Sequence, residues 1–162
     1  MSELTAEYVN SVLFYDEEIG ELFWKQSLAT NVKAGRRAGC LARGYVLVCI
    51  RRKLYQAHRL IWLIKTGEWP TRTVDHIDRD RANNRWSNLR LASPHEQQGN
   101  LPIRKNNKSG VRGVFWNRGK WLARISTTAG RKIHVGYFSD IAEAKAAYDK
   151  AASQQFGEFY RP

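Results

Sequence analysis

Short runs of alternating apolar and polar residues dominate the first half of the chain and predict β-strands. Residues 13–24 have apolar ends around a turn rich in Asp, Glu and Gly, which is the pattern of a β-hairpin. Residues 38–50 and 53–57 are joined by a charged turn and predict a second pair of strands. The spacing of apolar residues becomes helical over residues 4–12 and again over residues 57–70, where Gly and Pro mark the end of the helix.

A strand, a turn, a second strand and a helix are predicted within residues 73–100. The runs "TVDHI" and "NLRLA" are short and apolar, and a turn rich in Asp, Arg and Asn separates them. The helix is expected to begin at "SPHE". Ser93 is the expected N-cap, Pro94 occupies the first helical position, and Glu96 completes a capping box.

The last third of the chain predicts a small sheet packed on one helix. Residues 101–110 combine charges with residues that break helices and strands, and they predict a basic linker. Three strand-like runs with Gly-containing turns fill residues 111–138, and a helix with an alanine-rich apolar stripe follows as far as Gly157. We therefore expect an α+β protein with one domain over residues 1–100, the linker, and a second domain over residues 111–162.

The net charge of +12 is concentrated in the later two-thirds of the sequence. Residues 1–50 carry five Lys and Arg against six Asp and Glu, residues 51–100 carry ten against five, and residues 101–162 carry twelve against four. Basic residues interleaved with aromatic ones favour a nucleic acid as the partner over a generic solubilising charge. No segment pairs a basic face with a strongly apolar one, which makes a membrane surface a poor alternative.

The composition also limits the class of protein. No apolar run approaches the roughly 20 residues that span a bilayer, and the first residues are acidic and polar, unlike a secretory signal. Cys40 and Cys49 do not form a C-x-x-C pair, and two cysteines are too few for a disulfide scaffold. We expect an intracellular protein in its reduced form.

Asp75 and His76 are the candidates for chemistry, and as neighbours in a strand they point to opposite faces. Phosphodiester hydrolysis needs an activated water and a cation that stabilises charge on the phosphate and the departing 3′ oxygen. A histidine can accept the proton of the water near neutral pH. Carboxylate and amide oxygens suit Mg²⁺ or Mn²⁺.

These segments resemble the HNH endonuclease family, in the type associated with phages and introns. The signature of that type is Asp-His, a middle Asn before Leu, and an Asn early in the following helix. The resemblance covers most of residues 10–100 and includes "AHRLIW", "GEWP" and "VDHIDRDRANNRWSNLRLAS" in the same order. It implies a ββα-metal core after an N-terminal β-rich part, with double-stranded DNA as the substrate. It also implies a cytoplasmic location in a bacterial host cell if a phage encodes the protein.

The resemblance also implies a role for each residue of the motif. His76 is the expected general base, and Asp75 is an expected ligand of one Mg²⁺ or Mn²⁺ ion. Asn88 is expected to tie the hairpin together and to orient His76.

The second metal ligand of the family falls in the first turn of the helix, and Gln97 occupies that position where Asn or His is usual. Gln retains the amide oxygen but adds a methylene, so it must re-orient to reach a metal, and Mg²⁺ tolerates little geometric error. Asn100 lies one turn further on and His95 points elsewhere. We therefore expect Gln97 to be the second ligand.

Residues 109–160 resemble the plant ethylene-response-factor (APETALA-two) DNA-binding domain. The runs "VRGV", "GKW", "GYF" and "AYD" occur in the order of that family, which inserts a three-stranded sheet backed by one helix into the major groove. The expected DNA-binding residues are Arg112, Trp116, Arg124, Lys132 and His134. Arg124 stands where an acid is usual and His134 replaces a tryptophan, so the target sequence of the family cannot be transferred.

The sequence leaves more than one function open. A metal-dependent DNA endonuclease of a phage or mobile element, of the nicking or homing type, is the first. A non-catalytic, sequence-directed DNA-binding protein that retains an HNH scaffold is the alternative, and Gln97 motivates it. Binding of RNA or of a branched junction is a third possibility, because charge alone does not separate DNA from RNA. No protein partner is indicated.

Other polar residues have plainer interpretations. A structural zinc site made from Cys40, Cys49, His58 or His95 is disfavoured by its irregular spacing. His58 and Arg59 are interpreted as helix-start packing and a phosphate contact, and Asn83 and Asn84 as turn formers. The charged sheet face of residues 111–138 is open to a solvated, non-binding interpretation as well.

Overall fold

The computed structural model describes residues 4–127 and 131–162 of the chain. They form two compact units, Met1–Leu91 and Ala92–Pro162, each with its own hydrophobic core. Helices and small sheets are mixed along the whole chain, so the α+β class is confirmed. Within the described ranges, no helix combines the length and hydropathy needed to cross a membrane.

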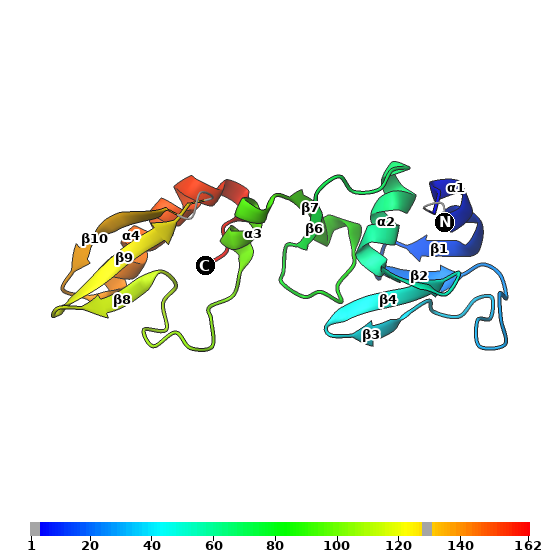
Figure 1. Cartoon of the computed structure of the whole chain (residues 1–162), viewed down its shortest axis with the longest axis horizontal. Coiled ribbons are helices and arrows are strands. Elements are labelled where there is room, and N and C mark those ends of the chain that lie inside the picture. The colour runs from blue at the N-terminus through cyan, green and yellow to red at the C-terminus, as the bar shows by residue number, and fades with distance from the viewer. Residues whose placement is uncertain (1–3, 128–130) are drawn as a thin grey trace. The chain divides into compact units, whose positions relative to one another are not determined.

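The N-terminal unit is built from short elements around helix α2, which packs against α1 and β4 (Figure 1). The hairpin expected over residues 13–24 is present and pairs Leu13 with Trp24. The elements are α1 (Ala6–Val12), β1 (Leu13–Asp16), β2 (Glu21–Trp24), β3 (Cys40–Ala42), β4 (Tyr45–Ile50), β5 (Lys53–Gln56), α2 (Ala57–Thr66), β6 (Thr73–His76), the 3-10 turn η1 (Trp86–Asn88) and β7 (Leu89–Ala92).

The single strand expected over residues 38–50 is wrong, because the chain turns within it. Arg43 and Gly44 have φ values of 51° and 82°, a left-handed conformation that turns the chain between β3 and β4. A three-stranded sheet in the order β3-β4-β5 results in place of the expected strand pair. Val48 and Ile50 of its central strand are almost fully buried and anchor the sheet in the core.

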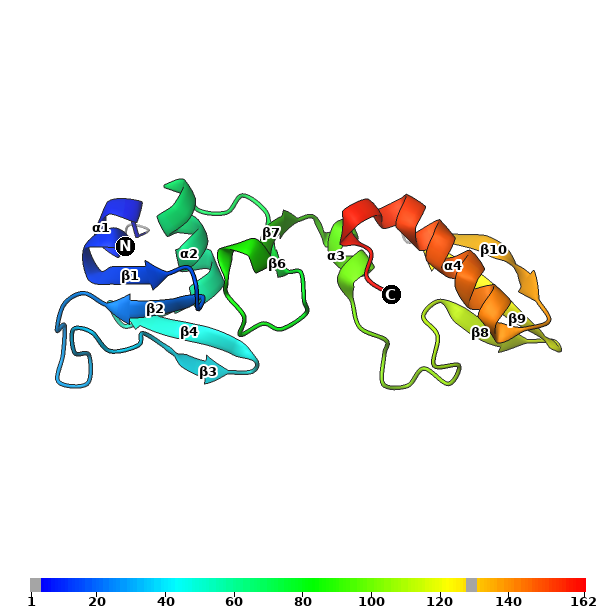
Figure 2. The ribbon, with the colours of Figure 1, turned by 180° about the vertical axis from the view of Figure 1, so that it is seen from behind.

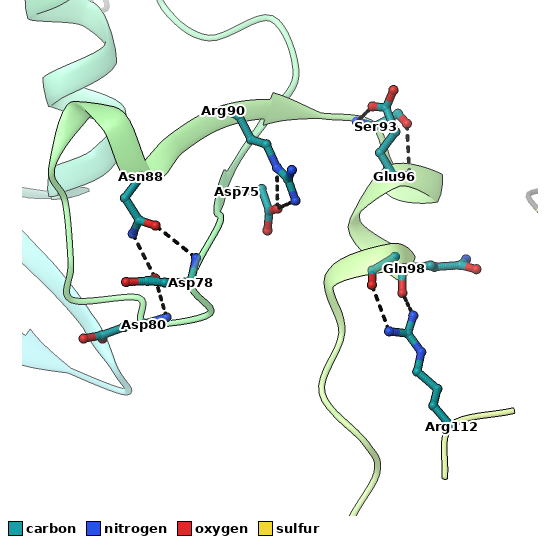
Figure 3. Close-up of polar contacts among 10 residues, drawn as sticks. Asp75, Asp78, Asp80, Asn88, Arg90, Ser93, Glu96, Gln98 and Arg112 are labelled. Carbon is teal, nitrogen blue, oxygen red and sulfur yellow. Dashed lines mark hydrogen bonds and ion pairs between the residues drawn. The ribbon is translucent and has the colours of Figure 1, made fainter. Parts of the chain in front are cut away.

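Helix α3 (Pro94–Asn100) begins with the expected capping box. Ser93 Oγ accepts a hydrogen bond from the Glu96 N–H, and Glu96 Oε2 accepts one from the Ser93 N–H (Figure 3). In the C-terminal unit α3 packs against α4 (Ile141–Phe156) and the 3-10 turn η2 (Gly157–Phe159). The arrangement of α3 with the β6-β7 pair as a ββα core stays a prediction, as do the domain boundaries that placed α3 in the nuclease domain.

The small sheet backed by one helix is present in the C-terminal unit. Strands β8 (Val114–Asn117), β9 (Lys120–Ser126) and β10 (Lys132–Phe138) form an antiparallel sheet in the order β10-β9-β8. Helix α4 lies along one face of this sheet, as the view from behind shows (Figure 2). The core between them contains Val114, Ala123, Ile125, Ala144, Tyr148, Ala152 and Phe156.

Gly113 brings the chain close to α4 just before β8. Its φ of 69° is left-handed, and a Cβ atom added there would lie 2.0 Å from Tyr148 Cε2 and 2.7 Å from the Arg124 carbonyl oxygen. Only glycine fits this position, because both the conformation and the space exclude a side chain.

Gly113→Ala is therefore expected to lower the free energy of unfolding by roughly 3–5 kcal/mol, since a steric clash adds to backbone strain. Urea unfolding followed by circular dichroism measures the loss. Gly119→Ala is the matched control, because Gly119 has a φ of 81° but no atom within 4 Å of an added Cβ. It should lose only about 1–2 kcal/mol. Equal losses in the two variants would contradict the packing of Gly113 on Tyr148.

Candidate active site

His76 ends strand β6 and is an interior side chain, only 5% exposed. Its ring lies edge-on to the ring of His58, with centroids 4.9 Å apart and an interplanar angle of 87°. The Tyr45 ring is 6.3 Å away. His76 Nε2 lies 3.0 Å from Oδ1 of Asn84, so the expected general base has a fixed ring orientation.

Asn84 is the residue that sequence reasoning missed. Asn83 and Asn84 were interpreted as turn formers, but neither has a positive φ, whereas Arg79 in the same loop has a φ of 70°. The Asn84 side chain is 2% exposed, and its Nδ2 donates to the Ala82 carbonyl at 3.1 Å. No sequence signal separates Asn84 from Asn83, because both stand in the same polar turn.

Asn88 holds together the two ends of the loop that connects β6 to β7. Its Oδ1 accepts from the Asp78 N–H at 3.0 Å, and its Nδ2 donates to Asp78 Oδ1 at 2.9 Å (Figure 3). The same Nδ2 donates to the Asn83 carbonyl at 2.8 Å. These contacts hold the loop, while the amide that faces His76 belongs to Asn84.

Asp78 is the acceptor at the centre of the loop. Its carboxylate accepts from the Asp80 N–H at 2.8 Å and from Asn83 Nδ2 at 2.6 Å, in addition to Asn88. Burial alone would raise the pKa of Asp78, but the hydrogen bonds from Asn83, Asn88 and Asp80 outweigh it, and the pKa lies below its ordinary value. An ionised carboxylate thus organises the turn between β6 and β7.

The β1-β2 hairpin, which lies near the start of the sequence, forms contacts with the loop between β6 and β7. The Tyr15 hydroxyl donates to the Asn84 carbonyl at 2.9 Å, and Arg85 Nε donates to the Glu18 carbonyl at 2.8 Å. Gly20, with a φ of 75°, lies so close that an added Cβ would be 2.5 Å from the Arg85 nitrogen. Residues 13–24 therefore position the loop as well as completing the core.

Asp75 precedes His76 in β6, and its carboxylate forms an ion pair with Arg90 of β7. Both Nε and Nη2 of Arg90 lie 3.2 Å from Asp75 Oδ2 (Figure 3). The two side chains are 14% and 15% exposed. A carboxylate has about four lone-pair sites on two oxygens, so its chemistry fits a divalent cation beside this ion pair.

Gln97, the other expected ligand, is half-buried in the first turns of α3, where its N–H donates to the Ser93 carbonyl at 3.0 Å. Asp75 belongs to the N-terminal unit and Gln97 to the C-terminal one, so their pairing on one metal stays a prediction. The neighbouring His95 contacts α4, with its Nε2 3.1 Å from Gln155 Nε2 and its ring 4.9 Å from that of Phe156.

The structural zinc site considered from the sequence is not supported by the described side chains. In the part of the chain that the structure describes, no group of three or more His, Cys, Asp or Glu side chains could hold a metal ion. Cys40 and Cys49 are free and exposed. His58 packs at the start of α2 against the rings of Tyr45 and His76.

In the C-terminal unit, three of the five expected DNA-binding residues share the sheet face that α4 leaves open. Strand register places Arg124 opposite His134, and Lys132 opposite Ser126, two residues further along β9. Arg124 lies over the Phe115 ring at 4.4 Å, and the rings of His134 and Tyr137 are 4.9 Å apart.

Arg112 and Trp116 lie elsewhere. Arg112 donates to the Gln98 carbonyl (Figure 3). It also donates to the carbonyls of Gly99 and Leu101, so it joins α3 to the start of the sheet. Trp116 pairs with Trp121 on the face that carries the buried Val114.

A basic groove of about 1150 Å³ runs beside β8 in the same unit. The basic linker expected over residues 101–110 contains no helix or strand, and its residues 101–109 form one wall of the groove. No Asp or Glu lines the groove among the described residues. Its cationic lining consists of Arg104, Lys105, Lys108, Arg112, Arg124 and Lys132.

Comparison with known proteins identifies the class to which this site belongs. Residues 55–98, which include β6, the loop and most of α3, match the family model described as HNH endonuclease. No solved structure matches the chain significantly. The chain carries an HNH endonuclease domain and belongs to the HNH endonuclease family.

Two viral relatives extend the similarity beyond this segment. The chain is 32% identical over 114 residues to Protein 3.8 of Escherichia phage T7, covering 68% of this chain and 94% of that protein. It is 36% identical over 110 residues to an uncharacterized HNH endonuclease of Acanthamoeba polyphaga mimivirus, covering 66% of this chain and 56% of the relative. The HNH family and the similarity to phage and viral proteins are therefore confirmed.

The ring packing around His76 leads to a prediction about pH. Burial, followed by the charges of His76 and Arg59, lowers the pKa of His58 from 6.5 to about 3. Between these two values the unfolded chain binds a proton at His58 and the folded protein does not. Stability should therefore fall as the pH falls below about 6.5, by up to about 1.4 kcal/mol per pH unit from this residue.

His58→Phe should remove this contribution while keeping an aromatic ring in the core. Urea unfolding of both proteins at several pH values between 7.5 and 4.5 (roughly the range over which a free imidazole gains its proton) measures the two slopes. A shallower slope in the variant is expected, and parallel curves would show that His58 is protonated in the folded protein.

Proposed function

We propose that the protein is a metal-dependent DNA endonuclease that hydrolyses phosphodiester bonds, of the nicking or homing type used by phages and mobile elements. The observation that carries the proposal is the Asp75-His76 pair at the end of β6, inside the segment that matches the HNH family. One such pair provides one hydrolytic centre, so a single chain nicks one strand at a time.

His76 acts as the general base in this proposal. It takes a proton from a water molecule as the water oxygen bonds to phosphorus and the bond from phosphorus to the 3′ oxygen breaks. The 3′ oxygen receives its proton from solvent. The rings of His58 and Tyr45 keep the base in a fixed orientation before DNA arrives.

One Mg²⁺ or Mn²⁺ ion would be held by oxygens of Asp75 and Gln97. When bound, such an ion supplies positive charge against the phosphate and the departing oxygen. Arg90 fixes the rotamer of Asp75 through two hydrogen bonds, which supports Asp75 as a ligand of defined geometry.

The C-terminal unit is proposed to bind duplex DNA. The resemblance of residues 109–160 to the ethylene-response-factor DNA-binding domain supports this proposal. The open sheet face offers Arg124, Lys132 and His134 beside exposed aromatic side chains. The basic groove beside β8 offers further cations for a phosphate backbone. A tethered second site of this kind raises the affinity of the nuclease unit for the same DNA.

The second candidate is a DNA-binding protein without catalysis, and Gln97 is the residue that favours it. A ligand that is one methylene too long can leave an intact scaffold with a weak metal site.

The catalytic proposal predicts that supercoiled plasmid is converted to the nicked form with Mg²⁺ or Mn²⁺, and not with EDTA. His76→Ala should slow nicking by about 10²–10⁴-fold, because the general base is lost. Cys49→Ala, at an exposed position outside the site, should nick as the unmodified protein does. An unmodified protein that cuts with neither metal would remove the catalytic claim.

Gln97→Asn tests the metal ligand. The shorter amide is expected to lower the Mn²⁺ concentration needed for half-maximal nicking, and Gln97→Ala is expected to raise it about 10–100-fold. Activity that appears only in Gln97→Asn would favour the non-catalytic reading. Identical metal dependence in all three proteins would exclude Gln97 as a ligand.

Arg124→Ala and Lys132→Ala test the sheet face. Each should weaken duplex binding and reduce the slope of log affinity against log salt by about 1. Lys150→Ala is the control, because Lys150 is an exposed residue of α4 on the other side of the sheet. Equal slopes for all three variants would exclude this sheet face as the DNA-binding surface. In a separate competition experiment, stronger binding of RNA or of a branched junction than of duplex DNA would identify that nucleic acid as the target.

A further inference from the structure

We infer that Arg43 and Arg81 form a phosphate-binding site that holds the backbone of duplex DNA beside the candidate active site. This inference rests on the proposed function, since the DNA bound there is the substrate of the nuclease. Binding of DNA by the two arginines can nevertheless be measured without any cleavage. The site belongs to the N-terminal unit, whereas the sheet face and the basic groove belong to the C-terminal unit.

Arginine occupies backbone conformations that it rarely adopts. Among residues 4–127 and 131–162, every non-glycine residue with a positive φ is an arginine: Arg43, Arg51, Arg52, Arg79 and Arg118. A left-handed backbone is unfavourable for a residue with a Cβ atom, and glycine, asparagine and aspartate are the residues that usually adopt it. These arginines therefore stand where the backbone disfavours them, which indicates that their side chains have a role.

Two of these turns lie at the two ends of strand β4. The turn between β3 and β4 consists of Arg43 and Gly44 alone, with φ values of 51° and 82°. Asn-Gly is the usual pair in a two-residue turn with positive φ at both positions. The turn between β4 and β5 consists of Arg51 and Arg52, with φ values of 50° and 64°. The length of the strand separates the two turns by roughly 20 Å.

The turn between β3 and β4 lies against Arg81, in the loop that follows His76. A Cβ atom added at Gly44 would be 3.8 Å from Arg81 Cδ, so the stem of Arg81 is a neighbour of this turn. The guanidinium carbon of Arg81 lies 4.8 Å from the centre of the Tyr45 ring. The centre of that ring is 6.3 Å from the centre of the His76 ring. Arg81, and Arg43 beside Gly44, therefore lie next to the candidate active site.

Arg81 stands at the tip of a turn that its neighbours hold in place. The Asn83 N–H donates to the Asp80 carbonyl at 3.1 Å, which makes Arg81 and Ala82 the central residues of a β-turn. The Ala82 N–H donates to Asp80 Oδ1 at 2.9 Å. The face of the Tyr45 ring attracts the guanidinium by a cation-π contact. The guanidinium is thus positioned before DNA arrives, so that less side-chain entropy is lost on binding.

Both guanidinium groups can accept an anionic partner. Arg43 and Arg81 are exposed, and among the described side chains neither forms an ion pair, whereas Arg37 and Arg90 each have a carboxylate partner. A guanidinium offers N–H donors in a planar fork that matches two oxygens of a phosphate. Two such groups beside a nuclease centre fit the phosphates of a DNA backbone.

Arg43→Asn separates the role in binding from the role in folding, because asparagine is favoured in the turn. The full-length variant should unfold at a higher urea concentration than the unmodified protein. It should bind duplex DNA about 5–10-fold more weakly at roughly 0.1 M salt, and the slope of log affinity against log salt should fall by about 1. Fluorescence anisotropy of a labelled duplex in EDTA measures both quantities. Arg81→Met, which keeps an unbranched side chain over Tyr45, should weaken binding to the same extent.

Arg52→Asn is the matched control, because it makes the same change in the turn at the other end of β4. It should also raise the urea concentration needed for unfolding, but it should bind DNA as the unmodified protein does. Arg43→Asn and Arg81→Met proteins that keep the affinity and salt slope of the unmodified protein would overturn the inference. An Arg52→Asn protein that loses as much affinity as Arg43→Asn would also overturn it, because the effect would then not depend on the position beside His76.

Nicking kinetics show whether the bound DNA is the substrate. A contact with the backbone is present before and during the reaction, so Arg43→Asn and Arg81→Met should raise KM by the factor seen in binding and leave kcat unchanged. A lower kcat with unchanged KM would overturn the binding role. No nicking by the unmodified protein would remove the proposed function instead, while the binding measured in EDTA still decides whether the two arginines hold DNA.

Discussion

The hydrogen bond between Asn84 and His76 is the interaction on which the candidate site depends. It joins two buried polar side chains, and each would be costly in the core without the other. A buried histidine that is held by this hydrogen bond and packed against the ring of His58 has a defined ring orientation. Preorganisation of this kind is what a general base needs, because the geometry is set before the substrate binds.

Several elements of the N-terminal unit hold Asn84 and His76 in place. Asn88 and the ionised Asp78 close the loop that carries Asn84, while Tyr15 and Gly20 support it from the first hairpin. Helix α2 contributes His58, whose neutral ring packs against His76. Elements that are far apart in the sequence of this unit therefore fix the position of His76.

The sequence was sufficient where local rules decide the structure. The hairpin over residues 13–24, the capping box at Ser93 and the sheet backed by α4 follow from turn chemistry, capping and apolar periodicity, which act over a few residues. The turn at Arg43 was missed because an arginine with a positive φ is uncommon and carries no signal beyond the glycine that follows it.

The functional side chains were harder to place because their roles depend on long-range contacts. Asn84 and Asn83 look alike in sequence, and only the fold turns one toward His76 and the other toward Asp78. The role of Arg112 as a DNA contact stays a prediction, and nothing in the sequence indicated that its guanidinium donates to carbonyls at the C-terminal end of α3 and just after it. Trp116 follows strand alternation onto the face of Val114.

The most direct test of a one-metal nuclease centre is the effect of Mn²⁺ on the amide spectrum of the ¹⁵N-labelled protein. A paramagnetic ion broadens the signals of residues near it, so substoichiometric Mn²⁺ should broaden Asp75, His76 and Gln97 together. Broadening that spares the amides of Asp75 and His76, or that is confined to amides near other acidic residues, would contradict a metal centre at the end of β6.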